Sequence, residues 1–249
     1  MGRREARIGG ITFEAVPLDR YQAVVATTWD GIEGGLAIRR DEVPRPGAHG
    51  SFGTPGYLSA RVLPFAGHLI QRTADATLNM RHRLIGLGDG QTRRLDVDLD
   101  GLFVWMNVAV ASQPTVAISG SDPRVATFDV QFWAPNPRMY GTERTFAAGE
   151  QVFQRGNFPA DPVIEVTGPR AAYTISTDTG KSITIGQALA TGQKHRIEMR
   201  TGRLYRDGVL QTGAITAGGT WTIPPTSPGI VHSISAAGPM SIIVTDTYI

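Results

Sequence analysis

Residues 128–141 of this chain read FDVQFWAPNPRMYG and combine a strand with an abrupt stop. Apolar and polar residues alternate in the first half of the stretch, which is the period of a half-buried β-strand. Pro135 and Pro137 then end that strand, because proline has no backbone N–H to donate to a neighbouring strand. A strand cut short near the middle of a 249-residue chain predicts a boundary between two domains, residues 1–141 and residues 142–249.

The composition favours strands over helices. Glycine and proline supply 30 and 16 of the residues, which suits many short strands joined by turns. We therefore expect a mainly β protein made of two antiparallel, β-sandwich-like domains. Asp100–Gly101 and Asp207–Gly208 each lie between strand-like runs and predict tight hairpins. The segment from Pro44 to Pro55 is so rich in glycine and proline that it predicts an irregular loop.

One helix is expected in the first domain, from Ala74 to about Leu87. Thr73 can cap its first turn, and Asp75 is favoured there by the helix dipole. Its apolar residues form two stripes, which are Ala74, Leu78 and Ile85 on one side and Ala76, Met80 and Leu84 on the other. A helix that is apolar on two sides is usually covered on both. We expect a sheet on one side and, on the other, either a neighbouring subunit or another part of the same chain.

Charge and targeting signals exclude several classes of protein. The chain has no cysteine, which rules out a disulfide framework, a thiolate metal site and a cysteine nucleophile. No apolar run is long enough to span a membrane, so we expect no membrane insertion. A net charge of +2 is too mild for a nucleic-acid-binding domain. The basic stretch Met1–Ile8 lacks the apolar core of a signal peptide, so export by that route is not expected.

The acidic residues Asp96, Asp98 and Asp100, followed by Gly101, copy the first half of a calcium-binding EF-hand loop. The match then fails, because Asn107 stands where the loop needs a bidentate carboxylate. Both flanks also alternate as strands. The better interpretation is a hairpin with an acidic, solvent-facing side.

Other motifs are equally incomplete. Gly180–Lys181–Ser182 ends like a phosphate-binding loop, but Ile175 stands where a glycine is required and a strand-like run follows. The spaced glycines Gly86, Gly88 and Gly90 are typical of a loop that ends a helix. None of the five histidines has the spacing of a metal ligand; they are His49, His68, His82, His195 and His232. We predict no catalytic, cofactor-binding or metal-binding residues.

Four tryptophans, Trp29, Trp105, Trp133 and Trp221, leave one alternative function open. They could form a sugar-stacking platform in a lectin-like second domain, which would make the protein a carbohydrate-binding module. Single tryptophans within apolar strands are more often core or interface residues. An enzyme is the weakest of the three classes, because no acidic pair and no nucleophile stands out.

Several further segments carry a family resemblance. In chain order they are residues 61–67 (RVLPFAG), 156–166 (GNFPADPVIEV), 179–185 (TGKSITI), 197–208 (IEMRTGRLYRDG) and 221–225 (WTIPP). With the strand ending at residues 128–141, they resemble the distal tail proteins of bacteriophages with long, flexible tails. The resemblance extends from about Arg45 to the end of the chain. Residues 1–43 do not share it.

The resemblance implies a structural virion protein with no enzymatic step. In that family the first domain builds a hexameric ring at the distal end of the tail tube, and a galectin-like second domain points outward. The implied partners are other copies of the chain, the tail tube protein, the tape measure protein and the hub or receptor-binding proteins. The implied location is the tail tip, after synthesis in the host cytoplasm, with DNA passing through the channel without specific binding. The acidic residues Asp96, Asp98 and Asp100 either line that channel or solvate an exterior hairpin.

Overall fold

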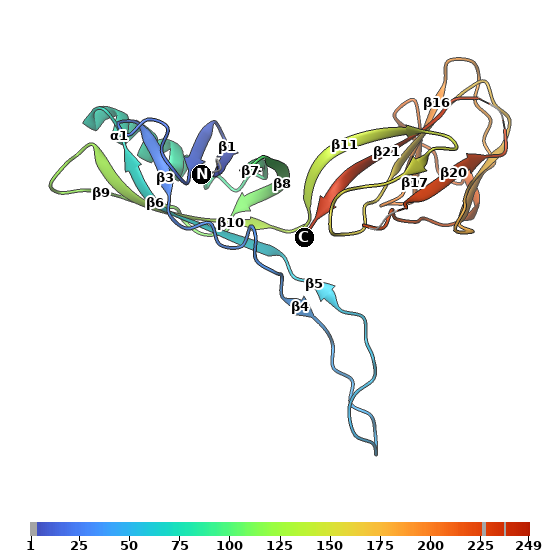
Figure 1. Ribbon diagram of the computed structural model, residues 1–249, viewed down its shortest axis with the longest axis horizontal. Helices are drawn as coiled ribbons and strands as arrows, with labels where there is room; N and C mark the ends of the chain where they lie inside the picture. Colours follow the sequence, from blue (N-terminus) through green and yellow to red (C-terminus); the bar gives the residue numbers. More distant parts are fainter. Residues whose placement is uncertain (1–3, 226–227, 237) are drawn as a thin grey trace. The chain divides into compact units, whose positions relative to one another are not determined.

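The computed structural model describes residues 4–225, 228–236 and 238–249 (Figure 1). The first three residues of the basic N-terminal stretch therefore lie outside the described residues. The chain divides into two compact units, Met1–Met139 with Ile249, and Tyr140–Tyr248. This division falls two residues before the boundary expected at residue 141. The turn between strands, residues 135–138, carries the two prolines that suggested it.

A closed barrel of seven strands forms the first unit. The strands are β1 (Arg4–Ile8), β2 (Ile11–Glu14), β3 (Ala23–Ala26), β6 (Arg61–Ile70), β7 (Arg93–Leu99), β8 (Leu102–Val110) and β10 (Val125–Ala134). Their order is β8-β7-β1-β2-β3-β6-β10, and β10 pairs back to β8 through Trp133 opposite Ala109. The mainly β class is confirmed, but the β-sandwich expected for the first domain is wrong. Because β10 is ten residues long, it reaches both β6 and β8 and closes the sheet.

One strand pair departs from the antiparallel pattern that we expected. β2 and β3 run parallel and share a single pair, Glu14 opposite Val25. The sequence gives no signal of this pairing, because eight residues that are mostly exposed separate the two strands. All other strand pairs within the barrel are antiparallel.

Aromatic side chains fill the barrel. Phe13 lies at the centre, with its ring 5.3 Å from that of Phe65, 5.5 Å from that of Phe128 and 6.2 Å from that of Phe132. Every second residue of β10 is buried, as the alternation of its sequence predicted. The tilted and edge-on ring contacts are those that aromatic quadrupoles favour, so these four rings pack as one cluster.

Helix α1 (Ala74–Gly86) follows β6 and contacts β9 (Thr115–Ile118) and β10. The Thr73 side chain accepts a hydrogen bond from the Ala76 N–H at 3.2 Å, which confirms the predicted cap. The helix ends at Gly86, as the spaced glycines indicated. Of the two predicted apolar stripes, only the one that contains Leu84 is packed.

A long, thin arm leaves the barrel between β3 and β6 (Figure 1). It contains β4 (Ile38–Arg39) and β5 (Tyr57–Leu58), which pair antiparallel. The irregular loop expected at residues 44–55 is the far end of this arm. It is partly paired rather than wholly irregular, since the Phe52 N–H donates to the Val43 carbonyl at 2.9 Å. Turn-rich sequence therefore forms a hairpin that projects from the barrel.

Two sheets packed face to face form the second unit. One sheet contains β18 (Val209–Leu210), β17 (Arg203–Arg206), β16 (Lys194–Glu198), β13 (Val163–Thr167), β21 (Met240–Tyr248) and β11 (Met139–Ala147). The other contains β12 (Gln151–Val152), β20 (Ile230–Ile234), β14 (Tyr173–Thr177), β15 (Ser182–Ile185) and β19 (Ile215–Gly218). Buried residues of both sheets belong to one hydrophobic cluster. The β-sandwich expected here is present, and its likeness to galectins stays a prediction.

Both predicted hairpins form. Asp100 and Gly101 adopt φ values of 55° and 98°, and Asp207 and Gly208 adopt 49° and 83°. Two successive positive φ angles are the requirement of a type I′ turn, whose twist matches that of the strands it joins.

Candidate assembly surfaces

The acidic hairpin lies on the outside of the barrel. Leu95 and Val97 of β7 point into the core, so Asp96 and Asp98 point outward. Arg94 binds Asp96 at 2.7 Å, and Asp98 accepts the Gly101 N–H at 2.8 Å. The hairpin interpretation is thus confirmed. Whether this side lines a channel stays a prediction, because that depends on the assembled ring.

Asp100, at the hairpin turn, belongs to a small ionic cluster. The Arg4 guanidinium lies 3.1 Å from the carboxylates of both Asp100 and Glu33. All three side chains are exposed to solvent, where such pairs contribute little to stability. The acidic charge of this hairpin is therefore partly balanced by arginines on its own surface.

An apolar patch lies on the outer face of β6 and β10. Val62 and Trp133 are directly opposite one another in the ladder, and 48% of Val62 and 42% of Trp133 are exposed. Ala109 of β8 adjoins Trp133 on the other side. We call Val62, Ala109 and Trp133 the outer patch. The alternation of β10 could have identified it, since Trp133 falls on the outward side of the strand, after the polar residues Thr127, Asp129 and Gln131.

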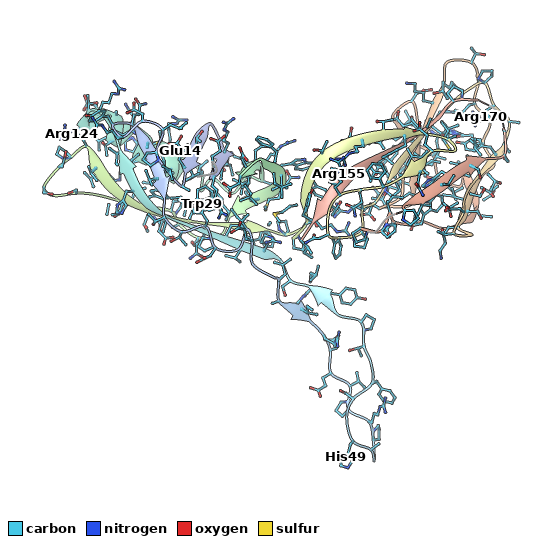
Figure 2. The ribbon with its side chains drawn as sticks, viewed as in Figure 1. Glu14, Trp29, His49, Arg124, Arg155 and Arg170 are labelled. Atoms are coloured by element: carbon cyan, nitrogen blue, oxygen red, sulfur yellow. The ribbon has the colours of Figure 1, made fainter. Side chains whose placement is uncertain are left out.

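The arm, residues 33–60, exposes apolar side chains along its whole length. They are Ile38, Val43, Phe52 and Tyr57. An isolated two-stranded ribbon cannot bury such side chains by itself. Figure 2 shows His49 at the far end of the arm, while Trp29 lies against the barrel. The pairing within this arm was not predicted, because its many glycines and prolines favour an irregular loop.

The outward stripe of α1 is a third apolar surface. Leu78 and Ile85 are 40% and 37% exposed, whereas Thr77 and Leu84 are buried against the barrel. The helix is therefore covered on one side within its own unit. Nothing among the described residues packs over the stripe of Leu78 and Ile85, so the neighbouring-subunit alternative stays open.

The histidines and acids do not assemble into a metal site. Across residues 4–225, 228–236 and 238–249, no group of three histidine, aspartate or glutamate side chains could hold an ion. His195 and His232 are buried in the second unit and bond to Tyr173 and Trp221. Within those same described ranges, no helix is both long and apolar enough to cross a membrane.

The remaining motifs have structural explanations. Gly180 and Lys181 lie in the turn between β14 and β15, with Gly180 at a φ of 82°, and Ser182 begins β15. Trp221, the single tryptophan of the second domain's sequence, is buried and donates its indole N–H to His232 at 2.9 Å. It cannot stack on a sugar in this position. The tryptophan platform of the carbohydrate-binding alternative is therefore wrong for the second unit.

Comparison with solved structures finds the same fold in phage tail proteins. The Dit protein (gp 19.1) of phage SPP1, described as a paradigm of the hub adsorption apparatus in phages that infect Gram-positive bacteria, matches with a TM-score of 0.77. The match covers 99% of each chain at 15% identity. A chain in the activated baseplate of phage P2 with Ca matches with a TM-score of 0.51, covering 98% of each chain at 8% identity.

No protein-family model matches the chain, and no curated protein matches it in sequence. The structural likeness at these identities shows the fold. The chain has a Dit-like fold over 99% of its length, so the likeness extends into the N-terminal region that did not share the sequence resemblance.

Proposed function

We propose that this protein is a structural, non-enzymatic component of a phage virion. It forms a hub at the distal end of the tail and connects the tail tube to the baseplate and its receptor-binding components. The observation that carries the proposal is the match to the SPP1 hub protein over 99% of both chains. The exposed arm and the outer patch support it, because both are surfaces that only another protein would cover.

The hub is a ring of six copies in this proposal. A closed ring with more than two subunits needs two different, complementary surfaces on each subunit. The arm supplies one of them, with its exposed Val43 and Phe52, and the outer patch of Val62, Ala109 and Trp133 supplies an apolar surface of the kind that such an arm needs. The outward stripe of α1 is a further candidate for contact between neighbouring copies.

The remaining partners follow from this position in the tail. The ring contacts the tail tube protein and the tape measure protein on one side, and hub or receptor-binding proteins on the other. DNA passes through its channel without specific binding. The mild net charge of +2 supports this last point, since strong phosphate contacts would hold the DNA.

Electron microscopy and mass photometry of the full-length protein test the proposal. We expect six-fold rings, and a loss of rings in Trp133→Glu, which places a charge in the outer patch. The matched control is Thr127→Glu, an exposed position on the same strand, which should still form rings. If the wild-type protein is monomeric in solution and also occupies no ring in purified tails, the proposed function is wrong. Rings that form equally well with Trp133→Glu would exclude the outer patch as the contact.

A further inference from the structure

Arg61 is a buried cation at the root of the arm. It is the first residue of β6, and only 1% of it is exposed. Among the described residues its guanidinium has no carboxylate partner, and burial lowers the pKa of Arg61 from its ordinary value. A buried charge without a counter-ion is costly, so its neighbours must solvate it by other means.

Backbone carbonyls accept hydrogen bonds from two of the three nitrogens of this guanidinium. Nε donates to the Pro137 carbonyl at 3.1 Å. Nη1 donates to the Ile32 carbonyl at 3.1 Å and also to the carbonyls of Gly31 and Gly34. Residues 31–34 lead into the arm, Arg61 follows it, and Pro137 lies in the turn that leaves β10. One side chain therefore ties together three separate pieces of backbone.

The contact of residues 31–34 with Arg61 and the start of β6, which we call the joint, is also tightly packed at Gly31. Its φ is +82°, and a Cβ on this residue would lie 2.2 Å from the Val62 carbonyl oxygen. Only glycine fits both the backbone conformation and the space. The close approach brings the Gly31 carbonyl to Arg61 and holds the entry to the arm against the start of β6.

The segment before the joint is anchored as well. The Trp29 ring lies 5.2 Å from that of Phe65, and its indole N–H donates to the Ala26 carbonyl at 2.7 Å. Ile32 is fully buried. The arm thus becomes free of the barrel only after residue 34, where the last carbonyl that Arg61 contacts is located.

We propose that Arg61 is the positioning residue of the arm. Its guanidinium fixes the root of the arm, residues 31–34 and 61, to the backbone that leaves β10, so that the arm is held in one direction. That the held arm then docks on the next copy of the chain rests on the proposed function. The joint itself is a property of the single chain and can be tested without a ring.

Pulsed electron paramagnetic resonance on the full-length chain tests the joint. The chain has no cysteine, so spin labels can be placed at Arg39→Cys on β4 and Thr127→Cys on β10 alone. Dilution with unlabelled protein removes distances between copies. We expect one narrow distance distribution in the wild type, and at least a twofold broadening in Arg61→Met and in Gly31→Ala. Arg124→Met, which removes an exposed arginine from the same unit, should leave the width unchanged.

The folded state of the barrel must be verified in the same samples by near-ultraviolet circular dichroism. If Arg61→Met does not fold, Arg61→Lys and Gly31→Ala still decide the matter, because a single ammonium cannot reach both Pro137 and the residues 31–34. A wild-type distribution that is already broad, or folded Arg61 variants as narrow as the wild type, would overturn the proposal. Absence of rings both in solution and in purified tails would instead contradict the proposed function and leave the joint intact.

Discussion

The phenolic hydroxyl of Tyr173 on β14 lies 2.8 Å from Nδ1 of His195 on β16, so one hydrogen bond joins the two sheets of the second unit. Both side chains are buried. Nε2 of His195 lies 3.1 Å from Oε1 of Gln187, an atom that can only accept. Nε2 therefore carries the proton, and Nδ1 accepts from Tyr173. This assignment holds for the neutral imidazole, which is the form that burial favours.

His232 must be neutral to form its own hydrogen bond. Its Nε2 accepts the indole N–H of Trp221 at 2.9 Å, and an indole can only donate. Burial is the main cause that lowers the pKa of both His195 and His232. The positive charge of Arg206 lowers the pKa of His195 further, while Asp207 opposes it, and Asp178 opposes the shift at His232.

We predict that the second unit loses stability in mild acid. Both histidines have folded pKa values below their unfolded value of about 6.5. The unfolded chain then binds more protons as the pH falls, so stability is present above about pH 6.5 and lost below it. The loss is at most about 1.4 kcal/mol per pH unit for each histidine. Denaturant unfolding at pH values between 7.5 and 5.5 measures this loss of unfolding free energy.

The variant His232→Gln should reduce the pH dependence without abolishing it, since His195 remains. His82→Gln, on the exposed side of α1, is the matched control and should leave the dependence unchanged. If the free energy of unfolding depends on pH equally in the wild type and in His232→Gln, His232 is not one of the groups responsible.

The two units should also fold separately. Residues 135–138 form a short irregular connection between β10 and β11, at the division between the two units. We expect fragments 1–138 and 139–249 each to show a cooperative thermal transition. Their near-ultraviolet spectra should sum to that of the full chain. A fragment that unfolds without a transition would show that the two units form one cooperative domain.

Local pattern was enough to predict one barrel strand, two hairpins and the start of the helix. The alternation of residues 128–134, the two Asp–Gly turns and the Thr73 cap are all short-range signals, and each is present in the structure. These features depend only on neighbouring residues, which is why one sequence suffices to locate them.

Closure of the barrel could not be predicted in the same way. It depends on Trp133 meeting Ala109 and on the parallel pair of Glu14 and Val25, which are contacts between residues distant in the sequence. The role of Arg61 could not be predicted from the sequence for the same reason. An arginine at the start of a strand suggests a solvated end, and only the fold brings the carbonyls of residues 31–34 and 137 around it.

Gly67 is predicted to be essential for the barrel. A Cβ at this position would lie 1.9 Å from the Val25 carbonyl oxygen, on the strand that pairs with β6. Because that atom belongs to the backbone, the two strands would have to separate. We expect Gly67→Ala to lower the free energy of unfolding by at least about 2 kcal/mol.

Gly86→Ala is the control for that substitution. Gly86 is the last residue of α1, and nothing lies within 4 Å of the position of its Cβ. This variant should unfold at the same denaturant concentration as the wild type, or slightly above it. A similar loss in both variants would mean that the close approach of Gly67 to β3 does not limit stability.

The outward stripe of α1 gives a prediction about assembly. Leu78→Lys should weaken ring formation if this stripe meets a neighbouring copy, since burial of an unpaired ammonium is costly. Asn79→Lys, the adjacent exposed residue, should leave assembly unchanged. Sedimentation velocity at several concentrations compares the two. Identical behaviour of Leu78→Lys and the wild type would remove α1 from the ring contact.

The acidic hairpin gives the last prediction, which concerns passage of DNA. If Asp96 and Asp98 line the channel of an assembled ring, their charge repels phosphates and keeps DNA from binding. A ring of Asp96→Lys subunits would then place one added cation per copy around the lumen. We expect such rings to bind duplex DNA more tightly than wild-type rings, with a steeper decrease in affinity as salt is raised.

Asp129→Lys makes the same change of charge on the outer face of β10 and serves as the control. Fluorescence anisotropy of labelled DNA at several salt concentrations, on rings verified by microscopy, separates the possibilities. A larger effect at position 96 than at position 129 supports a channel lining. Equal effects would mean that the hairpin acts only through net charge, and no effect at position 96 would place Asp96 and Asp98 on the exterior of the ring. Arg94 already pairs with Asp96, so the wild-type hairpin repels DNA less than three unpaired carboxylates would. The salt dependence of DNA affinity is therefore a more sensitive measurement than the affinity at a single salt concentration.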